Sequence, residues 1–136
     1  MSFRFSHVAV TVPVEQLAGI ARGELVEFYR EVFGWHEDPG LAIPGQRIFL
    51  CAPTATQYIT IRASEAPMQT SGYEHLGIIA DSEAELRTIH ERATAAASRF
   101  PDLELQPIKS EYGGTLLTFR MRFRLPLTLE LQHIRV

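Results

Sequence analysis

Two histidines half a chain apart are the residues whose type and spacing most suggest chemistry. His7 opens the segment 7–12, and His75 opens the similar segment 75–80. Their offset is 75 − 7 = 68 residues, half of the 136-residue chain. A late carboxylate, Glu130, lies among leucines, where burial without a partner would be costly. Two imidazoles and one carboxylate form a common divalent-metal donor set that leaves coordination positions open.

The half-length offset also predicts that one supersecondary unit occurs twice. In the first copy, apolar residues alternate in a strand and then follow a helical period, before further strands separated by turn residues. The ranges expected there are a strand over 3–12, a helix over 15–33 with an irregular front, a short strand within 35–41, strands over 47–52 and 57–63, and a turn over 53–56.

The second copy follows the same plan. Ser82 and Glu85 form a capping box, which predicts a helix start at this point. The ranges expected are a strand over 73–80, a helix from 83 to about 100, and strands over 103–109, 115–124 and 127–135.

These elements predict an α+β fold of two βαβββ modules. The modules are expected over about 1–64 and 73–136, with a linker over about 65–72, and together they would form one domain over 1–136. Each module has a helix that can cover one face of its sheet, so the two curved mixed sheets would enclose a cleft with their other faces.

Strand alternation assigns the side chains to these faces. Rows of valines and leucines would face the helices, while the rows that contain His7, His75 and Glu130 would line the cleft. A single histidine in a strand is more often a hydrogen-bonded structural residue, and a strand glutamate usually faces solvent. The equivalent repeat positions of the two histidines favour a metal site over that alternative.

Composition narrows the possible partners. Hydrophobic residues make up 46% of the chain and charged residues 21%, as in an ordinary soluble protein. The net charge of −3 gives no reason to expect nucleic acid or an acidic membrane surface as a partner. One cysteine, Cys51, excludes an internal disulfide, and no signal or spanning segment is evident. We therefore expect a cytoplasmic protein.

Four segments resemble the vicinal oxygen chelate superfamily, which includes glyoxalase I, bleomycin-resistance proteins, fosfomycin-resistance transferases and extradiol dioxygenases. They are residues 7–12, 75–82, 129–131 and, most specifically, the run Glu-Phe-Tyr-Arg-Glu-Val-Phe-Gly-Trp at 27–35. The resemblance covers both halves and implies paired βαβββ modules. It places the family's metal ligands on His7, His75 and Glu130.

The resemblance also identifies a departure. Enzymes such as glyoxalase I have a fourth ligand, a glutamate or glutamine, on the fourth strand. The repeat places that position at Thr60, at an offset of 130 − 60 = 70 residues from Glu130. Threonine is a poor metal ligand, so the remaining pattern is similar to that of the transferases and dioxygenases.

Other side chains are candidates for substrate binding. Arg120 and Arg122 alternate with apolar residues, and guanidinium groups beside a metal would suit an anionic substrate. Further candidates are Tyr58, Thr60 and Arg62, which share one predicted face, and Tyr112, in a loop beside two glycines. A solvated strand face and ordinary surface packing are the alternative explanations. No residue stands out as a general base, so the catalytic residue is unassigned.

Three functions fit this pattern. The first is a metal-dependent enzyme of the glyoxalase or dioxygenase type, in which Fe, Mn, Zn, Ni or Mg binds a small, oxygen-rich and anionic substrate. The second is a metal-free, drug-sequestering protein of the bleomycin-resistance type. The third is a scaffold or regulatory domain with a vestigial site. A homodimer is expected, because two chains can pair their open sheet faces.

Overall fold

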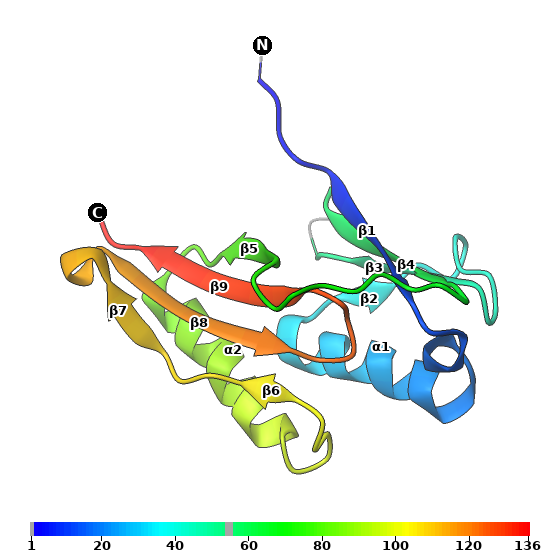
Figure 1. The fold of residues 1–136 in the computed structure, drawn as a ribbon. Helices are drawn as coiled ribbons and strands as arrows, with labels where there is room; N and C mark the ends of the chain where they lie inside the picture. Colours follow the sequence, from blue (N-terminus) through cyan, green and yellow to red (C-terminus); the bar gives the residue numbers. More distant parts are fainter. Residues whose placement is uncertain (1, 54–55) are drawn as a thin grey trace. The chain divides into compact units, whose positions relative to one another are not determined.

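A computed structural model describes residues 2–53 and 56–136 of the chain (Figure 1). Residues 54 and 55 of the expected turn at 53–56 lie outside the described residues. The chain divides into two compact units, Met1–Gln69 and Thr70–Val136. Each unit is built from a helix packed against a mixed sheet.

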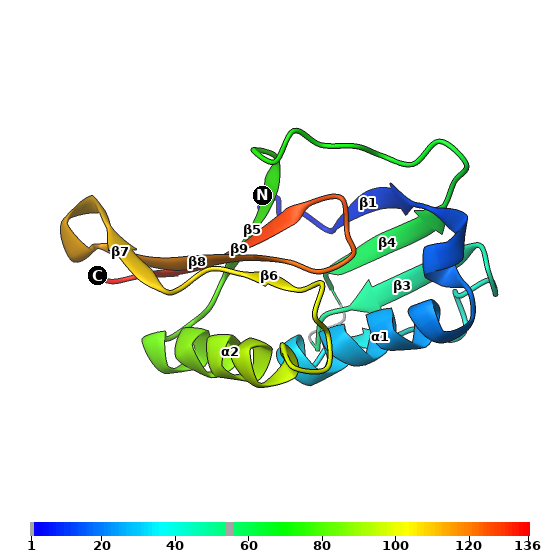
Figure 2. The ribbon, with the colours of Figure 1, turned by 60° about the horizontal axis from the view of Figure 1, so that its bottom comes forward.

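The described residues of the first unit form one strand, one helix and three further strands, as predicted. These elements are β1 (His7–Val12), α1 (Gly19–Phe33), β2 (His36–Glu37), β3 (Arg47–Cys51) and β4 (Tyr58–Ala63). The strand order is β1-β4-β3-β2. β1 and β4 are parallel, whereas the other neighbours are antiparallel. Figure 2 shows α1 along one face of this sheet.

Helix α1 owes its position to one apolar stripe. Leu25, Phe28, Tyr29 and Val32 recur on one side of the helix and are fully buried. Gly34 ends the helix in the left-handed region, at a φ of 71°, and its amide donates to the Arg30 carbonyl. The expected start at residue 15 is wrong for the α-helix, because Val14–Leu17 forms a separate 3-10 turn.

The second unit repeats the plan with one edge strand divided in two. Its elements are β5 (His75–Ile79), α2 (Glu83–Ala96), β6 (Glu104–Leu105), β7 (Lys109–Glu111), β8 (Leu116–Arg122) and β9 (Thr128–Ile134). The sheet order is β5-β9-β8, and both β6 and β7 pair with β8. The single strand expected over 103–109 is thus interrupted at Pro107, which has no amide hydrogen to donate.

Helix α2 begins where the sequence predicts. The Ser82 hydroxyl accepts a hydrogen bond from the Glu85 amide at 3.0 Å, an N-cap contact that stabilises a helix by about 1 kcal/mol. The helix ends at Ala96 rather than near residue 100, and residues 97–99 form a turn before Pro101. The apolar residues Leu86, Ile89, Ala93, Ala96, Ala97 and Phe100 recur at helical spacing and predict a buried stripe; Ala97 is exposed, whereas Phe100 is buried.

In both units the strand faces are divided as alternation predicts. Val10, Val12, Leu129 and Leu131 are buried in the core, on the opposite side of their strands from the histidine rows. We call the side of each sheet that carries His7 or His75 its histidine face. The α+β class with mixed sheets is confirmed. In the described part of the chain, no helix combines the length and apolar character needed to cross a bilayer.

Candidate functional site

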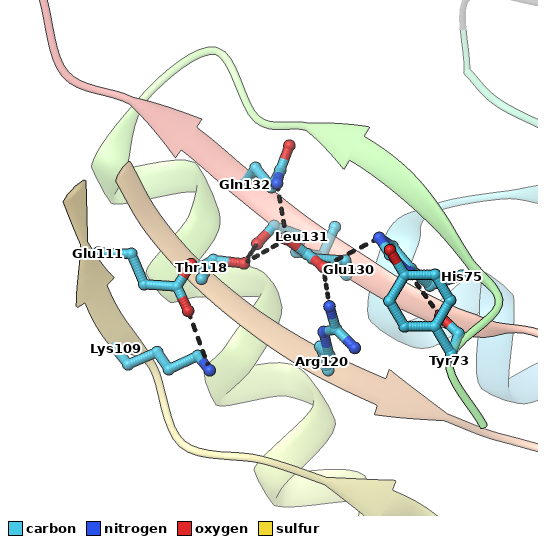
Figure 3. Close-up of polar contacts among 9 residues, drawn as sticks. All are labelled: Tyr73, His75, Lys109, Glu111, Thr118, Arg120, Glu130, Leu131 and Gln132. Carbon is cyan, nitrogen blue, oxygen red and sulfur yellow. Dashed lines mark hydrogen bonds and ion pairs between the residues drawn. The ribbon is translucent and has the colours of Figure 1, made fainter. Parts of the chain in front are cut away.

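Glu130 is the centre of the polar cluster on the second sheet. It lies in the middle of β9, between Leu129 and Leu131, and is only 6% exposed. The register places it beside Gly77 of β5 on one side and Arg120 of β8 on the other. Figure 3 shows the side chains that converge on its carboxylate from all three strands.

One oxygen of this carboxylate is fixed by neutral donors. Gln132 Nε2 donates to Glu130 Oε1 at 2.6 Å. The Thr118 hydroxyl lies 3.4 Å from the same oxygen and 2.9 Å from the Leu131 carbonyl, to which it also donates. These contacts hold the carboxylate in one orientation on the sheet.

The other oxygen, Oε2, faces positive or potentially positive nitrogens. Arg120 Nη2 lies 2.8 Å from it and His75 Nε2 lies 3.4 Å from it. Among the described residues, however, no group donates a well-aligned hydrogen bond to Oε2, which is buried. A buried carboxylate oxygen with incomplete hydrogen bonding is costly unless a cation completes its shell.

The surroundings keep Glu130 ionised. Burial by itself raises the pKa of this carboxyl. The hydrogen bond from Gln132 and the charges of Arg120 and His75 lower it by more, so the pKa of Glu130 lies below its usual range. The group is therefore a carboxylate at neutral pH and can act as a metal ligand.

His75 is oriented for a role at its outer nitrogen. Its Nδ1 lies 2.7 Å from the Tyr73 carbonyl oxygen. A carbonyl can only accept, so Nδ1 carries the hydrogen and, in a neutral ring, Nε2 presents a lone pair. The Tyr73 ring also packs edge-on against the imidazole, with 5.7 Å between the ring centroids. This second contact restricts rotation of the ring.

The His75 and Glu130 pair fits a divalent metal ion. Two atoms 3.4 Å apart can both reach one ion through bonds of about 2.0–2.2 Å. The Nδ1 contact to a backbone carbonyl is the usual support of a metal-binding histidine. Within the described residues, no group of three or more His, Cys, Asp or Glu side chains is arranged to hold a metal. The second unit thus brings two candidate ligands, His75 and Glu130, within 3.4 Å of each other.

The two arginines predicted to bind substrate differ in their contacts. Arg120 is directed at Glu130, and about a third of its side chain is exposed. Arg122 has its Nε bonded to the Leu125 carbonyl at 3.1 Å, which holds it at the turn after β8. Arg120 is therefore part of the carboxylate cluster, whereas Arg122 supports the turn.

His7 lies in the first unit, at the start of β1. Its ring stacks on that of Tyr58, at 4.7 Å between centroids and 4° between planes. Its Nδ1 lies 2.7 Å from the Ser6 hydroxyl, a partner that can donate or accept. His7 is exposed.

The remaining predicted substrate residues occupy two different places. Tyr58, Thr60 and Arg62 alternate along β4 on the histidine face of the first sheet. Tyr112 lies in the second unit, in the tight turn before Gly113 and Gly114. Its side chain is 79% exposed and its φ is 50°, so it projects from an unusual backbone position.

Thr118 and Gln132 are the contributors that sequence reasoning missed. Alternation already places Gln132 two residues after Glu130 on the same face, but a glutamine in a strand suggests no chemistry by itself. Thr118 is only 1% exposed. Its position two residues before Arg120 indicates that the two side chains share a face of β8. The pairing of β8 with β9 is also needed to predict that Thr118 lies near Glu130.

Solved structures with the same fold are known. FosX, a fosfomycin resistance protein from Listeria monocytogenes, matches with a TM-score of 0.69 at 18% identity, over 100% of this chain and 97% of that one. A FosX mutant complexed with Mn(II) and 1S,2S-dihydroxypropylphosphonic acid matches with a TM-score of 0.67 at 19% identity, over 96% and 90% of the two chains.

A lactoylglutathione lyase from Agrobacterium tumefaciens matches with a TM-score of 0.62 at 18% identity, over 96% of this chain and 92% of that one. The chain has the vicinal oxygen chelate fold. These neighbours belong to that superfamily, so the resemblance seen in the sequence is confirmed for the fold. Neither a protein-family model nor a curated protein sequence matches the chain.

Proposed function

We propose that this vicinal oxygen chelate protein is a metal-dependent enzyme acting on a small, oxygen-rich, anionic substrate. His7, His75 and Glu130 would hold one divalent ion. Arg120, Arg122, Tyr58, Thr60, Arg62 and Tyr112 are the candidates for substrate contact. The neighbours support the general type, since a FosX structure contains Mn(II) and a phosphonate.

The observation that carries this proposal is the incomplete shell of Glu130 Oε2. This buried oxygen has no hydrogen bond of good alignment among the described residues; Arg120 Nη2 lies 2.8 Å from it and the oriented His75 Nε2 lies 3.4 Å from it. A purely structural carboxylate would be expected to have both oxygens satisfied.

The residues have separable roles in this proposal. A bound divalent ion would supply Lewis acidity to a substrate oxygen. Gln132 and Thr118 would keep Glu130 in one orientation, and the Tyr73 carbonyl would do the same for His75. Arg120, once released from the carboxylate, would place a guanidinium beside an anionic substrate group.

One observation favours the metal-free binding protein as the second candidate. Arg120 Nη2 lies 2.8 Å from the same oxygen that a metal would use, so the guanidinium already neutralises the carboxylate. In that case the histidine face of the second sheet would be a structural ion-pair cluster. A ligand would then bind by charge and stacking alone.

The metal content of the untagged protein tests the proposal. We expect about one divalent ion per chain in the purified protein, measured by inductively coupled plasma mass spectrometry. His7→Ala, His75→Ala and Glu130→Ala should each abolish it, whereas Thr60→Ala should leave it unchanged. A parent protein that contains no metal and does not bind added Mn(II) or Fe(II) would instead support the metal-free candidate.

We also propose that the two units act as one domain and that the protein is a homodimer. The whole-chain match to FosX and the lyase supports the single domain. Light scattering coupled to size-exclusion chromatography should give twice the monomer mass. A monomer at all concentrations would reject the dimer without affecting the metal test.

A further inference from the structure

Two arginines lie side by side on the histidine face of the first sheet. The antiparallel register of β3 and β4 pairs Arg47 directly with Arg62. Like charges directly opposite each other destabilise a sheet. Such a pair is unexpected unless something of opposite charge is bound near it.

Neither arginine is neutralised within the described chain. Arg47 donates from Nε and Nη2 to the Leu41 carbonyl, at 3.2 and 3.1 Å, and its guanidinium lies over the Phe49 ring. These contacts fix the group but leave its positive charge unbalanced. Arg62 is exposed, and no carboxylate of the described residues is bonded to either guanidinium.

A hollow lies between these arginines and β1. Its volume is about 310 Å³, at the lower end of the range of about 300–1,000 Å³ for small-molecule sites. Its lining residues all belong to the first unit and are Ala9, Val10, Thr11, Arg47, Phe49, Thr60, Arg62 and Met68. The Met68 amide donates to the Thr11 hydroxyl at 2.7 Å, which holds the segment after β4 against the hollow.

The lining has one cationic region and one apolar region. Arg62, Arg47 and Thr60 provide N–H and O–H donors, of which the two guanidiniums suit a carboxylate, phosphate or phosphonate. Phe49 and Met68 provide apolar surface next to them. The Phe49 ring itself packs against Tyr58, with 5.5 Å between the ring centroids. This contact restricts the movement of the Phe49 ring.

We propose that this hollow binds an organic anion whose carboxylate or tetrahedral oxyanion lies between Arg47 and Arg62 and whose apolar part packs on Phe49. The Thr60 hydroxyl would donate to the same anionic group. Thr60 and Arg62 are also candidates for substrate contact in the proposed function, so this inference rests on it and adds Arg47 and Phe49 as the residues that would select the anion. A test on metal-stripped protein keeps a loss of anion binding distinguishable from a loss of metal binding.

Titration of the metal-stripped protein tests this proposal, with phenylphosphonate and benzoate as probes. We expect saturable binding of one anion per chain in isothermal titration calorimetry, with amide shifts in NMR concentrated at Phe49, Thr60 and Arg62. Inorganic phosphate should bind more weakly, because it lacks the apolar part. Benzylamine, which has the ring but the opposite charge, should not bind.

Variants separate a specific site from general electrostatic attraction. Arg62→Gln should weaken phenylphosphonate binding by at least about tenfold, and Arg62→Lys should weaken it less. Arg92→Gln removes the same charge from an exposed position of α2 and should change affinity less than twofold. Because Arg62 has no bonded partner among the described residues, the variant is expected to fold, which the amide spectrum will verify.

Three results would overturn the proposal. The first is equal affinity in the wild-type and Arg62→Gln proteins. The second is an equal loss in Arg92→Gln, which would indicate charge attraction alone. The third is a set of shifts concentrated at Arg120 and Arg122, which would place the anion on the second unit instead.

Discussion

The histidine faces of the two sheets have the same backbone frame but opposite chemistry. In each sheet a histidine begins the first parallel strand, and the next strand carries a residue at the equivalent central position. That residue is Thr60 in the first sheet and Glu130 in the second. The neighbouring antiparallel strand presents Phe49 to the threonine and Arg120 to the glutamate.

This difference shows that two copies of one backbone arrangement can carry different sets of functional side chains. The second sheet concentrates hydrogen-bond donors and cations around one carboxylate. The first sheet has two adjacent guanidiniums, from Arg47 and Arg62, and a stacked pair of rings, His7 on Tyr58. The chemistry of one is suited to a cation and that of the other to an anion with apolar surface.

The largest expected effect comes from removing the central residue of each sheet. Glu130→Ala leaves Gln132 without its acceptor and Arg120 without its counter-charge, so we expect a loss of about 1.5–3 kcal/mol in the free energy of unfolding. Thr60→Ala should change it by less than about 0.5 kcal/mol. Urea unfolding of both variants measures the contrast, and equal losses would mean that the two positions are energetically alike.

Replacement of the histidines tests whether His7 is held by ring stacking and His75 by polar contacts. His7→Phe keeps the stack on Tyr58 and should leave stability nearly unchanged. His75→Phe loses the hydrogen bond to the Tyr73 carbonyl and the contact with Glu130, for which we expect a loss of about 1 kcal/mol. Thermal unfolding of the metal-free variants checks this. A larger loss in His7→Phe would contradict the proposed contrast.

The turn between β8 and β9 adds a pH-dependent contact to the second unit. Arg124 Nε donates to Asp102 Oδ2 at 2.8 Å, and this bond holds the pKa of Asp102 below its ordinary value. The stabilisation is present above about pH 4 and is lost as the pH falls through the lowered pKa. Because the carboxylate is about half exposed, it should be worth less than about 1 kcal/mol.

Comparison with Asp102→Asn isolates that contact. The wild type should be the more stable protein at pH 6, and the difference should shrink towards pH 2.5, as measured by urea unfolding at both pH values. A difference that stays constant or grows with acidification would show that the carboxylate charge is not responsible.

The smallest expected effect comes from making the first sheet like the second. Arg62→Gln introduces the residue found at the equivalent position, Gln132, and relieves the repulsion from Arg47. We expect the free energy of unfolding to rise by about 0.2–0.5 kcal/mol at low ionic strength. This increase should become smaller as salt screens the charges. A destabilised variant would imply that Arg62 has a stabilising partner in the folded protein.

Much of the fold could be predicted because it depends on local signals. The Phe28 and Tyr29 stripe, the Gly34 stop and the Ser82 cap each act within one or two helical turns. Alternation likewise assigned the faces of β1, β5 and β9 correctly. The break at Pro107 and the end of α2 at Ala96 were missed, because both depend on where backbone hydrogen bonds are lost.

The candidate site was only partly predictable for a related reason. Residue types point to His75 and Glu130, and the repeat relates them to His7. The roles of Thr118, Gln132 and the Tyr73 carbonyl depend on strand register and on a backbone contact, which carry no compositional signal. The Arg47–Arg62 pair also appears only when β3 and β4 are aligned.

Mn(II) titration followed by electron paramagnetic resonance is the most direct test of the central claim that the second sheet is a metal-binding face. We predict one saturable Mn(II) site per chain in the wild type. The affinity for Mn(II) should be at least about tenfold weaker in Glu130→Gln and unchanged in Thr60→Ala. Saturable binding that is unchanged by Glu130→Gln, or free Mn(II) at every ratio in the wild type, would contradict it.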